Sequence, residues 1–578
     1  MGRPMGNAEI AATFARLADL LEIGGESAYR TSAYRRAAET LAAHPEPIAA
    51  IAGRGELLKL PNVGKAIADK IGDLLETGTF PLLEETERLY PAGVADLLTV
   101  PDIGPKRARA LFESLGIDGL PALREAVAGD RLAAVPGIGV GAAKRIAEGL
   151  GSMATGDQRL PLGVVREIGA ALIARLRDVA PPIEAIELAG SARRMRETVG
   201  DLDLVAAATD TEGVVAAFAA LADVERVELR GPNRCRALLD SGLPADLWVL
   251  PPPHFATLLF HITGDQHHDT RMRELARERG AKLSEYGLTS EGETTTFPDE
   301  AAIYRAFDMD PIPATMREGR DAIVLARDHR LPATVEAGDI RGDLHVHSRW
   351  SDGKRTVREM ADAAHALGYS YLCITDHSQG LGVANGLGPE RLAEQRREID
   401  AVNAEVAPFR VLQGCEVEVR GDGSLDLPDE VLATLDWVTA SVHSNLRTGR
   451  DRVTARALAA IEHPLVDVLA HPTGRIVGGR AGGNFDMEAL FAAAAATGTA
   501  LEINADPARL DLRDTHAAAA VAAGCSLTIG SDAHDTPGLT NARVYGVAVA
   551  QRAWVPADRI LTTLPVDDLL ARRKRSRA

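Results

Sequence analysis

Seven short apolar runs, separated by longer alanine-rich stretches, make up most of residues 341–578 and constrain the fold more than any other feature of the chain. Short strand-like runs that alternate with helical segments are typical of an α/β fold with a parallel sheet. We therefore expect seven strands here, at residues 343–348, 371–378, 410–419, 437–444, 466–473, 500–505 and 526–534. The same region contains nine of the chain's fifteen histidines.

Six of these seven runs carry a histidine or carboxylate at or near their carboxyl end. Because the loops after parallel strands meet at one mouth of an α/β barrel, we expect these side chains to converge in one pocket. The expected ligands are His345, His347, Asp352, His377, Glu416, His443, His471, Asp532 and His534. A single histidine at a strand end is more often a core residue, but nine suitable residues favour a metal cluster.

The ligand types in this cluster limit the metals and the chemistry. Six imidazoles and three carboxylates suit two or three Mn²⁺, Zn²⁺ or Fe ions better than Mg²⁺ alone. Metal ions held in this way support the hydrolysis of phosphoesters. Asn504, at the end of the sixth run, is expected to line the pocket without binding metal.

A second set of carboxylates lies in the middle of the chain. Asp201 and Asp203 are two residues apart in a strand-like run, so they share one face, and Asp246 lies in a second strand-like run. Three such carboxylates can hold the two divalent cations that in-line nucleotidyl transfer requires. Gly190 and Ser191 begin a turn suited to a phosphate, and Arg194 follows as a bidentate donor.

One short pattern occurs three times between residues 60 and 150, as LPNVGKAIADKI, VPDIGPKRARAL and VPGIGVGAAKRI. The glycines Gly64, Gly104 and Gly139 allow backbone N–H groups to approach an anion, and the following helix adds its positive end. Either these residues only end ordinary helices, or they form phosphate contacts. The repetition favours the second interpretation, and the pattern resembles the helix-hairpin-helix motif, which binds the DNA backbone without reading sequence.

Residues from about 10 to 320 resemble the family X DNA polymerases, relatives of DNA polymerase beta, through GS…R…GDLD, ADLW and TGD…RMREL…SEYGL. The resemblance implies that Asp201, Asp203 and Asp246 bind Mg²⁺ or Mn²⁺ in a nucleotidyltransferase palm. It implies triphosphate contacts at Ser191, Arg194 and Arg159, a turn beside the sugar at Thr263 and Gly264, template contacts at Arg273 and Tyr286, and a lyase lysine at Lys70. A lysine on a helix surface is more often simply solvated.

The nucleotide pocket departs from the family pattern. His261 and Ile262 replace the usual aromatic pair, and Asp269 replaces an asparagine near the base. Trp248 stands where the family often has an arginine. A carboxylate accepts hydrogen bonds but cannot donate them, so fidelity and sugar selectivity stay open.

The last region resembles the polymerase and histidinol phosphatase (PHP) domain, through HVHS…SDG, TDHS, GCEVEV, SVHS, AHP and GSDAH. The order of regions resembles a bacterial family X polymerase with a C-terminal PHP domain. That resemblance implies gap-filling synthesis in DNA repair, a metal-dependent 3′–5′ exonuclease and, in some members, cleavage at abasic sites. The implied partners are gapped or nicked DNA and deoxynucleoside triphosphates, with the protein a monomer.

The expected fold class is multidomain, α and α/β. It combines a helical hairpin region, a palm with a thumb, and a distorted seven-stranded (β/α) barrel. The expected domains are a helical lyase-like domain (1–90), a fingers-like domain (91–160), palm (161–255), thumb (256–320), linker (321–340) and PHP domain (341–578).

Composition excludes several classes of protein. With 46% apolar and 25% charged residues, the chain has ordinary globular usage and no run of 18 apolar residues, so we expect a cytoplasmic protein with no membrane segment. Four cysteines without a CxxC pair exclude a disulfide scaffold or zinc ribbon. The net charge of −18 does not exclude DNA, because an acidic total can hide basic patches.

Three other functions stay open on sequence alone. The palm could be an inactive DNA-binding scaffold that carries a catalytic barrel. The barrel could be a small-molecule phosphatase, although the fused DNA-binding motifs argue against it. The whole chain could be a structural adaptor in repair, in which case the barrel would hold no metal.

Overall fold

The computed structural model describes residues 5, 7–43, 48–100, 102–154, 159–319, 322–446 and 448–574. The chain divides into two compact units, Met1–Gln158 and Arg159–Ala578. Among the described residues, no helix combines the length and the apolar character needed to cross a bilayer.

The first unit is helical, and its three repeated segments form three similar turns. In each turn the residue two positions before the conserved glycine of the repeat is left-handed: Asn62 (φ 59°), Asp102 (φ 68°) and Gly137 (φ 82°). A helix begins directly after Gly64, Gly104 and Gly139. The helices are α1 (Asn7–Ile23), α2 (Ala28–Ala43), α3 (Ile48–Gly53), α4 (Lys65–Thr77), α5 (Pro81–Leu89), α6 (Gly93–Asp96), α7 (Pro105–Leu115), α8 (Leu120–Ala128) and α9 (Val140–Ala154).

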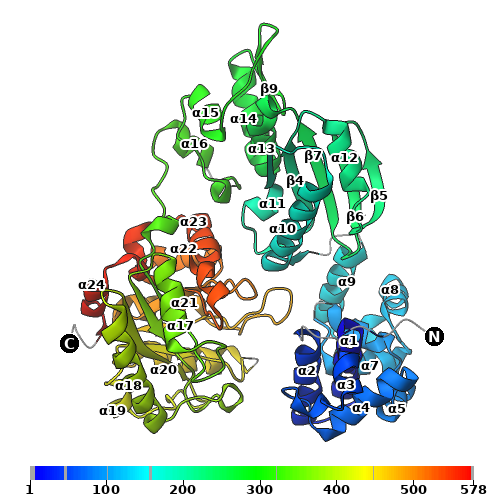
Figure 1. The fold of residues 1–578 in the computed structure, drawn as a ribbon, viewed down its shortest axis with the longest axis vertical. Helices are drawn as coiled ribbons and strands as arrows, with labels where there is room; N and C mark the ends of the chain where they lie inside the picture. Colours follow the sequence, from blue (N-terminus) through cyan, green and yellow to red (C-terminus); the bar gives the residue numbers. More distant parts are fainter. Residues whose placement is uncertain are drawn as a thin grey trace. The chain divides into compact units, whose positions relative to one another are not determined.

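The second unit begins with a five-stranded sheet in the order β2-β4-β7-β6-β5. Strands β4 and β7 are parallel and central, and the other pairs are antiparallel; Figure 1 shows β4, β7, β6 and β5 next to one another. The elements are β1 (Leu160–Pro161), α10 (Leu162–Val179), β2 (Ala185–Leu188), α11 (Gly190–Arg193), β3 (Thr198–Val199), β4 (Leu202–Ala207), α12 (Thr211–Ala219), β5 (Val224–Arg230), β6 (Arg234–Leu239) and β7 (Pro244–Leu250). This sheet has the position in the chain that the sequence predicts for the palm.

A smaller subdomain follows the sheet, where the thumb is expected. Its core packs Phe260, Tyr304 and Phe307 against one another. Its elements are α13 (Phe255–Thr263), α14 (Gln266–Glu278), β8 (Lys282–Ser284), β9 (Gly287–Ser290), β10 (Glu293–Thr295), α15 (Glu300–Ala306) and α16 (Ala322–Arg327).

The last region is a parallel seven-stranded barrel with strands in sequence order. The first and last strands approach closure, because the backbone N–H of His347 donates to Ala533 (2.9 Å) and that of Asp532 donates to His345 (2.9 Å). The strands are β11 (Gly342–Val346), β12 (Tyr371–Ile374), β13 (Arg410–Glu418), β14 (Trp437–Ser441), β15 (Val468–Leu469), β16 (Ala500–Asn504) and β17 (Leu527–Gly530). All seven predicted strands are present, and the predicted fold class is confirmed.

Helices follow the barrel strands along the chain, and α17 and α18 pack on β12 and β13 respectively. They are α17 (Val357–Ala366), α18 (Pro389–Val406), α19 (Asp429–Leu432), α20 (Arg450–Glu462), α21 (Met487–Thr497), α22 (Asp514–Ala522), α23 (Val547–Arg552) and α24 (Val566–Ala571).

The palm packs tightly on the barrel within the second unit. Buried residues of both, such as Leu172 and Leu510, belong to one continuous apolar core. At Gly163 on α10, a Cβ would lie 2.7 Å from the side chain of Pro507. Arg475 of the barrel also forms an ion pair with Glu197 (2.7 Å).

Candidate functional sites

Three carboxylates meet at the centre of the palm sheet. Asp203 on β4 is the register partner of Asp246 on β7, and Asp201 directly precedes β4. Burial, together with the nearby charges of Asp201 and Asp246, raises the pKa of Asp203 to about 7. Carboxylates that repel one another in this way favour divalent cations, which would offset the repulsion.

A glycine brings the turn that contains Ser191 against this trio. Gly190 begins α11 in the left-handed region (φ 55°), and a Cβ there would overlap the carboxylate of Asp203. Ser191, the next residue, has a buried hydroxyl without a hydrogen-bond partner among the described residues. The turn therefore presents an unused polar group close to the acid trio.

Arg234 is a member of this site that sequence reasoning missed. Its guanidinium makes a bidentate contact with Asp246 (2.9 and 2.6 Å) and lies over the ring of Trp248 at 4.1 Å. Arg234, from β6, therefore contacts both the third carboxylate and Trp248, one of the positions that depart from the family pattern. The sequence signal that could have identified Arg234 is a basic residue twelve positions before Asp246, the third carboxylate.

The expected triphosphate arginines lie between palm and thumb, or on the palm edge. Arg194 donates to the carbonyl of Thr263 and to the carboxylate of Glu318, both at 2.8 Å. Gly264 caps the end of α13, next to this contact. Arg159 directly precedes β1. Its guanidinium donates to the carbonyl (2.6 Å) and to the hydroxyl (3.1 Å) of Thr198 on β3.

Two departures from the family pattern contact each other. His261 and Asp269 are joined by a 2.7 Å hydrogen bond, and Arg273 forms an ion pair with Asp269 (2.9 Å). Asp269 therefore has two partners within the thumb. Tyr286 lies on the thumb surface with 44% of its area exposed.

Lys70 lies in the first unit, on α4, and is half-buried. Its Nζ donates to the carbonyl of Ala66, one turn earlier (3.0 Å). No carboxylate or other titratable partner is described for it. The proposed lyase role of Lys70 stays a prediction.

The barrel brings the nine expected ligands together at the carboxyl ends of its strands. Three groups of them place ligand atoms within 4.8 Å of one another, and neighbouring groups share His347 or His377. The groups are His347, Asp352, His377 and His534; His345, His347 and Asp532; and His377, Glu416 and His443. The ninth residue, His471, contacts the carboxylate of Glu416 through Nε2 (2.8 Å).

Several of these ligand atoms are buried and have no hydrogen-bond partner in the part of the chain that the structure describes. They include both ring nitrogens of His347, Nε2 of His345, Nδ1 of His377 and of His471, and Oε2 of Glu416. Buried polar atoms are rarely left unpaired, because that costs free energy. These orphaned atoms converge from several strands, so the residues present fit a cluster of metal ions.

The charges of the cluster also suit cations. Burial opposes it, but the carboxylates of Glu416 and Asp352 raise the pKa of His377 to about 10. Burial and the neighbouring His534 and His377 lower the pKa of His347 to about 3. In the absence of metal, protons on some histidines balance the carboxylates, and metal binding would release those protons.

Two further carboxylates orient the ligands. Glu502 on β16 accepts from Nδ1 of His345 (2.7 Å) and from the backbone N–H of His471 (2.8 Å). Glu418 on β13 accepts from Nδ1 of His443 (2.7 Å). Such contacts fix the ring that a metal ligand presents. Sequence reasoning missed both, although each lies two residues from a residue it had singled out. Asn504 donates to Glu502 (3.1 Å) and Asp532 (3.0 Å), as a lining residue.

A carboxylate trio on a mixed sheet and a separate barrel that gathers nine potential metal ligands are typical of enzymes that act on phosphoesters. Family models match in four places: a helix-hairpin-helix domain (5–80), a SAM-like helix-hairpin-helix tandem (94–152), the DNA polymerase beta thumb (258–318) and the PHP domain (343–504).

Over 564 residues the chain is 36% identical to the DNA polymerase/3′–5′ exonuclease PolX of Bacillus subtilis (strain 168), covering 97% of this chain and 98% of that protein. The chain therefore belongs to the PolX family of family X DNA polymerase/3′–5′ exonucleases. The predicted family is confirmed, and so is the predicted enzyme class.

Shorter similarities point to phosphatases. The chain is 31% identical over 205 residues to a probable phosphatase of Aliivibrio fischeri, covering 34% of this chain and 78% of that protein. It is also 31% identical over 166 residues to a probable phosphatase of Syntrophotalea carbinolica, covering 28% and 64%.

Proposed function

We propose that this protein fills short gaps in DNA at the palm and trims 3′ ends at the barrel. The observation that carries the proposal is that one unit holds clustered potential metal ligands in the barrel and, apart from them, the carboxylates of Asp203 and Asp246 in register on the palm sheet with Asp201 nearby. One cluster has only carboxylates, which suit Mg²⁺ or Mn²⁺, and the other is rich in imidazole.

In the palm, Asp201, Asp203 and Asp246 would hold two Mg²⁺ or Mn²⁺ ions. Such ions activate the primer 3′-hydroxyl and neutralise the triphosphate. The chain's own groups would position the substrates. These are Gly190, Ser191, Arg194 and Arg159 for the triphosphate, Thr263 and Gly264 for the sugar, Arg273 and Tyr286 for the template, and the turns at Gly64, Gly104 and Gly139 for the backbone of gapped or nicked DNA.

In the barrel, the nine ligands would hold two or three ions of Mn²⁺, Zn²⁺ or Fe. Ions in such a site polarise a phosphodiester and activate water. Glu502 and Glu418 would keep His345, His471 and His443 in the orientation that binds metal. The overlap of the three ligand groups supports ions close enough to act on one phosphate.

A gapped duplex with Mn²⁺, incubated with and without nucleotides, tests both assignments. We expect Asp203→Ala to abolish primer extension and leave degradation intact, and His345→Ala to do the reverse. A parent protein that degrades DNA but never extends a primer would support the inactive-scaffold alternative. Metal analysis of the purified protein separates both from a structural adaptor, which would contain none.

The second candidate is a phosphatase acting on small phosphomonoesters, and the similarity to probable phosphatases favours it. A comparison of rates on a labelled oligonucleotide and on small phosphomonoesters decides between the two. Faster hydrolysis of the small substrates would contradict the nuclease assignment.

We also propose that the protein is a monomer. Light scattering on the same preparation tests this.

A further inference from the structure

Glu318, just before α16, links the palm to the barrel. Its carboxylate accepts from Nε of Arg194 (2.8 Å) and from Nη2 of Arg552 (2.8 Å), and Arg196 approaches to 3.1 Å. The side chains of Glu318, Arg194 and Arg552 are 19%, 13% and 7% exposed, so water screens these contacts weakly. Burial opposes it, but Arg552 and Arg194 lower the pKa of Glu318 to about 2 and keep it ionised.

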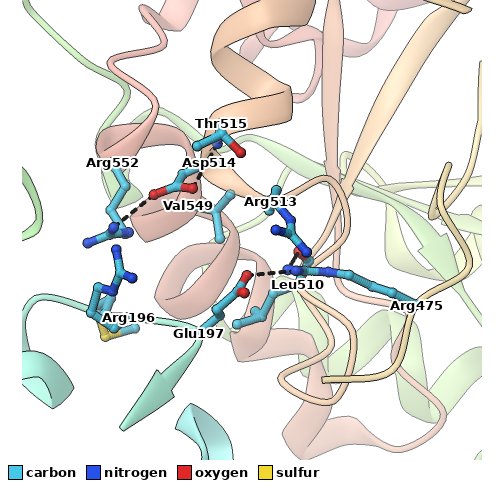
Figure 2. A pocket seen from close by; sticks show the side chains of 10 residues that line it. Arg196, Glu197, Arg475, Leu510, Arg513, Asp514, Thr515, Val549 and Arg552 are labelled. Atoms are coloured by element: carbon cyan, nitrogen blue, oxygen red, sulfur yellow. Dashed lines mark hydrogen bonds and ion pairs between the residues drawn. The ribbon is translucent and has the colours of Figure 1, made fainter. Parts of the chain in front are cut away.

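Arg552 ends α23 of the barrel and reaches the same palm residue in a second way. Its Nη1 donates to the backbone carbonyl of Arg194 (3.0 Å), while Nη2 also contacts Asp514 at the start of α22 (2.8 Å). Figure 2 shows Arg552 joined to Asp514 beside Arg196. These residues line a cavity of about 170 Å³ between palm and barrel. The barrel thus holds Arg194 by its backbone directly and by its side chain through Glu318.

These contacts fix the plane of the Arg194 guanidinium. Nε is bonded to Glu318 and Nη1 to the carbonyl of Thr263, whereas Nη2 has no hydrogen-bond partner among the described residues. Arg194 caps the end of α11, whose first residue, Gly190, lies against the carboxylate of Asp203, so the guanidinium is placed beside the acid trio. A donor held in place before the substrate arrives loses less entropy on binding.

We propose that Arg552 is a positioning residue for the polymerase: through Glu318 it holds Arg194 ready for the incoming triphosphate, so the nuclease barrel sets the nucleotide affinity of the palm. This inference rests on the proposed role of Arg194 as a triphosphate contact. Neither Arg552 nor Glu318 needs to touch the nucleotide.

If Glu318 hindered nucleotide binding instead of supporting it, its removal would change the KM for the nucleotide in the opposite direction. If Glu318 competed with the triphosphate for Arg194, its removal would strengthen nucleotide binding. If Glu318 positions Arg194, its removal weakens binding and leaves the chemical step nearly unchanged. The KM for the nucleotide therefore distinguishes the two roles, and kcat separates both from general damage.

The experiment measures KM and kcat for single-nucleotide gap filling in the full chain. The variants are Arg552→Met, Arg552→Lys, Glu318→Gln and the double variant Arg552→Met with Glu318→Gln. Glu197→Gln is the matched control, because it breaks another ion pair between palm and barrel, with Arg475, that does not reach Arg194. Exonuclease activity on a single-stranded 3′ end reports whether the barrel of each variant is folded.

We expect KM to rise about tenfold in Arg552→Met and Glu318→Gln, which is a loss of one charge-assisted hydrogen bond. Arg552→Lys should recover part of the loss, and the double variant should be no worse than the worse single variant. The control and all exonuclease rates should stay within about twofold.

An unchanged or lower KM overturns the inference, and so do additive effects in the double variant. A joint fall of kcat and exonuclease activity in every Arg552 and Glu318 variant also overturns it, because that pattern means a purely structural contact. A parent protein that does not extend primers overturns the proposed function, and this inference with it.

Discussion

The ionisation of Asp203 controls metal binding in the proposed palm site. Its raised pKa of about 7 means that the folded protein still holds this proton at pH 5 to 6, where an ordinary aspartate has released it. Protons and divalent cations then compete for the same carboxylate. The sign follows directly: metal binding improves as the pH rises towards the raised pKa and levels off above it.

We therefore expect primer extension at limiting Mg²⁺ to rise steeply between about pH 5.5 and 7, and excess Mg²⁺ to move that rise to lower pH. Initial rates across this range at two Mg²⁺ concentrations measure it. Far-UV circular dichroism across the same pH range serves as the control for acid damage. A pH profile of extension that is identical at both concentrations would contradict the competition.

Gly190 offers a second test at the scale of one residue. A methyl group there would overlap the carboxylate of Asp203, and the left-handed backbone adds strain. We expect Gly190→Ala to reduce primer extension at least a hundredfold, because a displacement of about 1 Å at a reacting centre has that effect. Gly231→Ala is the control, since a Cβ at Gly231 makes only an ordinary contact. Full activity of Gly190→Ala would show that the carboxylate can move away at no cost.

At this scale the sequence predicts residues whose neighbours in the chain define them. Asp203 lies on β4, Asp201 directly precedes that strand, and Gly190 begins α11, so local spacing is enough to find them. Arg234 and Glu318 were not predicted, because each acts on a partner that only the sheet order or the packing of palm on barrel brings near. Glu318 lies 124 residues from Arg194.

The barrel strands are the elements where sequence and structure agree best. Each predicted run is short, apolar and bounded by turns, and the carboxyl ends of parallel strands must meet on one side. That rule explains why the ligands converge although they span residues 345 to 534. The rule does not identify Glu502, because the sequence does not distinguish a glutamate inside the barrel from one at an exposed strand edge.

Glu502 gives the prediction for a strand. It fixes His345 and His471 from β16 without belonging to the ligand set. We expect Glu502→Gln to lower exonuclease activity and bound metal by about 10–100-fold while leaving primer extension unchanged. Elemental analysis and both assays measure this. Glu430→Gln, at an exposed position on α19, is the control. A variant that retains its metal but loses exonuclease activity would instead give Glu502 a part in the reaction itself.

The whole molecule consists of two units, each with cores of its own. The first packs residues such as Phe14 and Phe80, and the second packs palm and barrel around a separate core. The sequence predicts five domains and one linker, and those boundaries stay predictions. The apolar residues that join palm to barrel are scattered along the chain, so no local pattern reveals that they form one core.

A protein of residues 159–578 alone should fold and retain exonuclease activity on single-stranded 3′ ends. Without the three turns that are proposed to contact phosphates, its affinity for a gapped duplex should fall and depend less steeply on salt. Fluorescence anisotropy at several salt concentrations measures both, with the full chain as the reference. An unchanged salt slope would remove the turns from the DNA contact.

The unbroken apolar core between palm and barrel also has a consequence in the cell. Each copy of the protein that can extend a DNA strand also contains the site that degrades one. The two activities are therefore present in a ratio of one to one, and a change in expression alters both equally. A substitution that destabilises the palm or the barrel exposes both to proteolysis, so the cell loses both activities together.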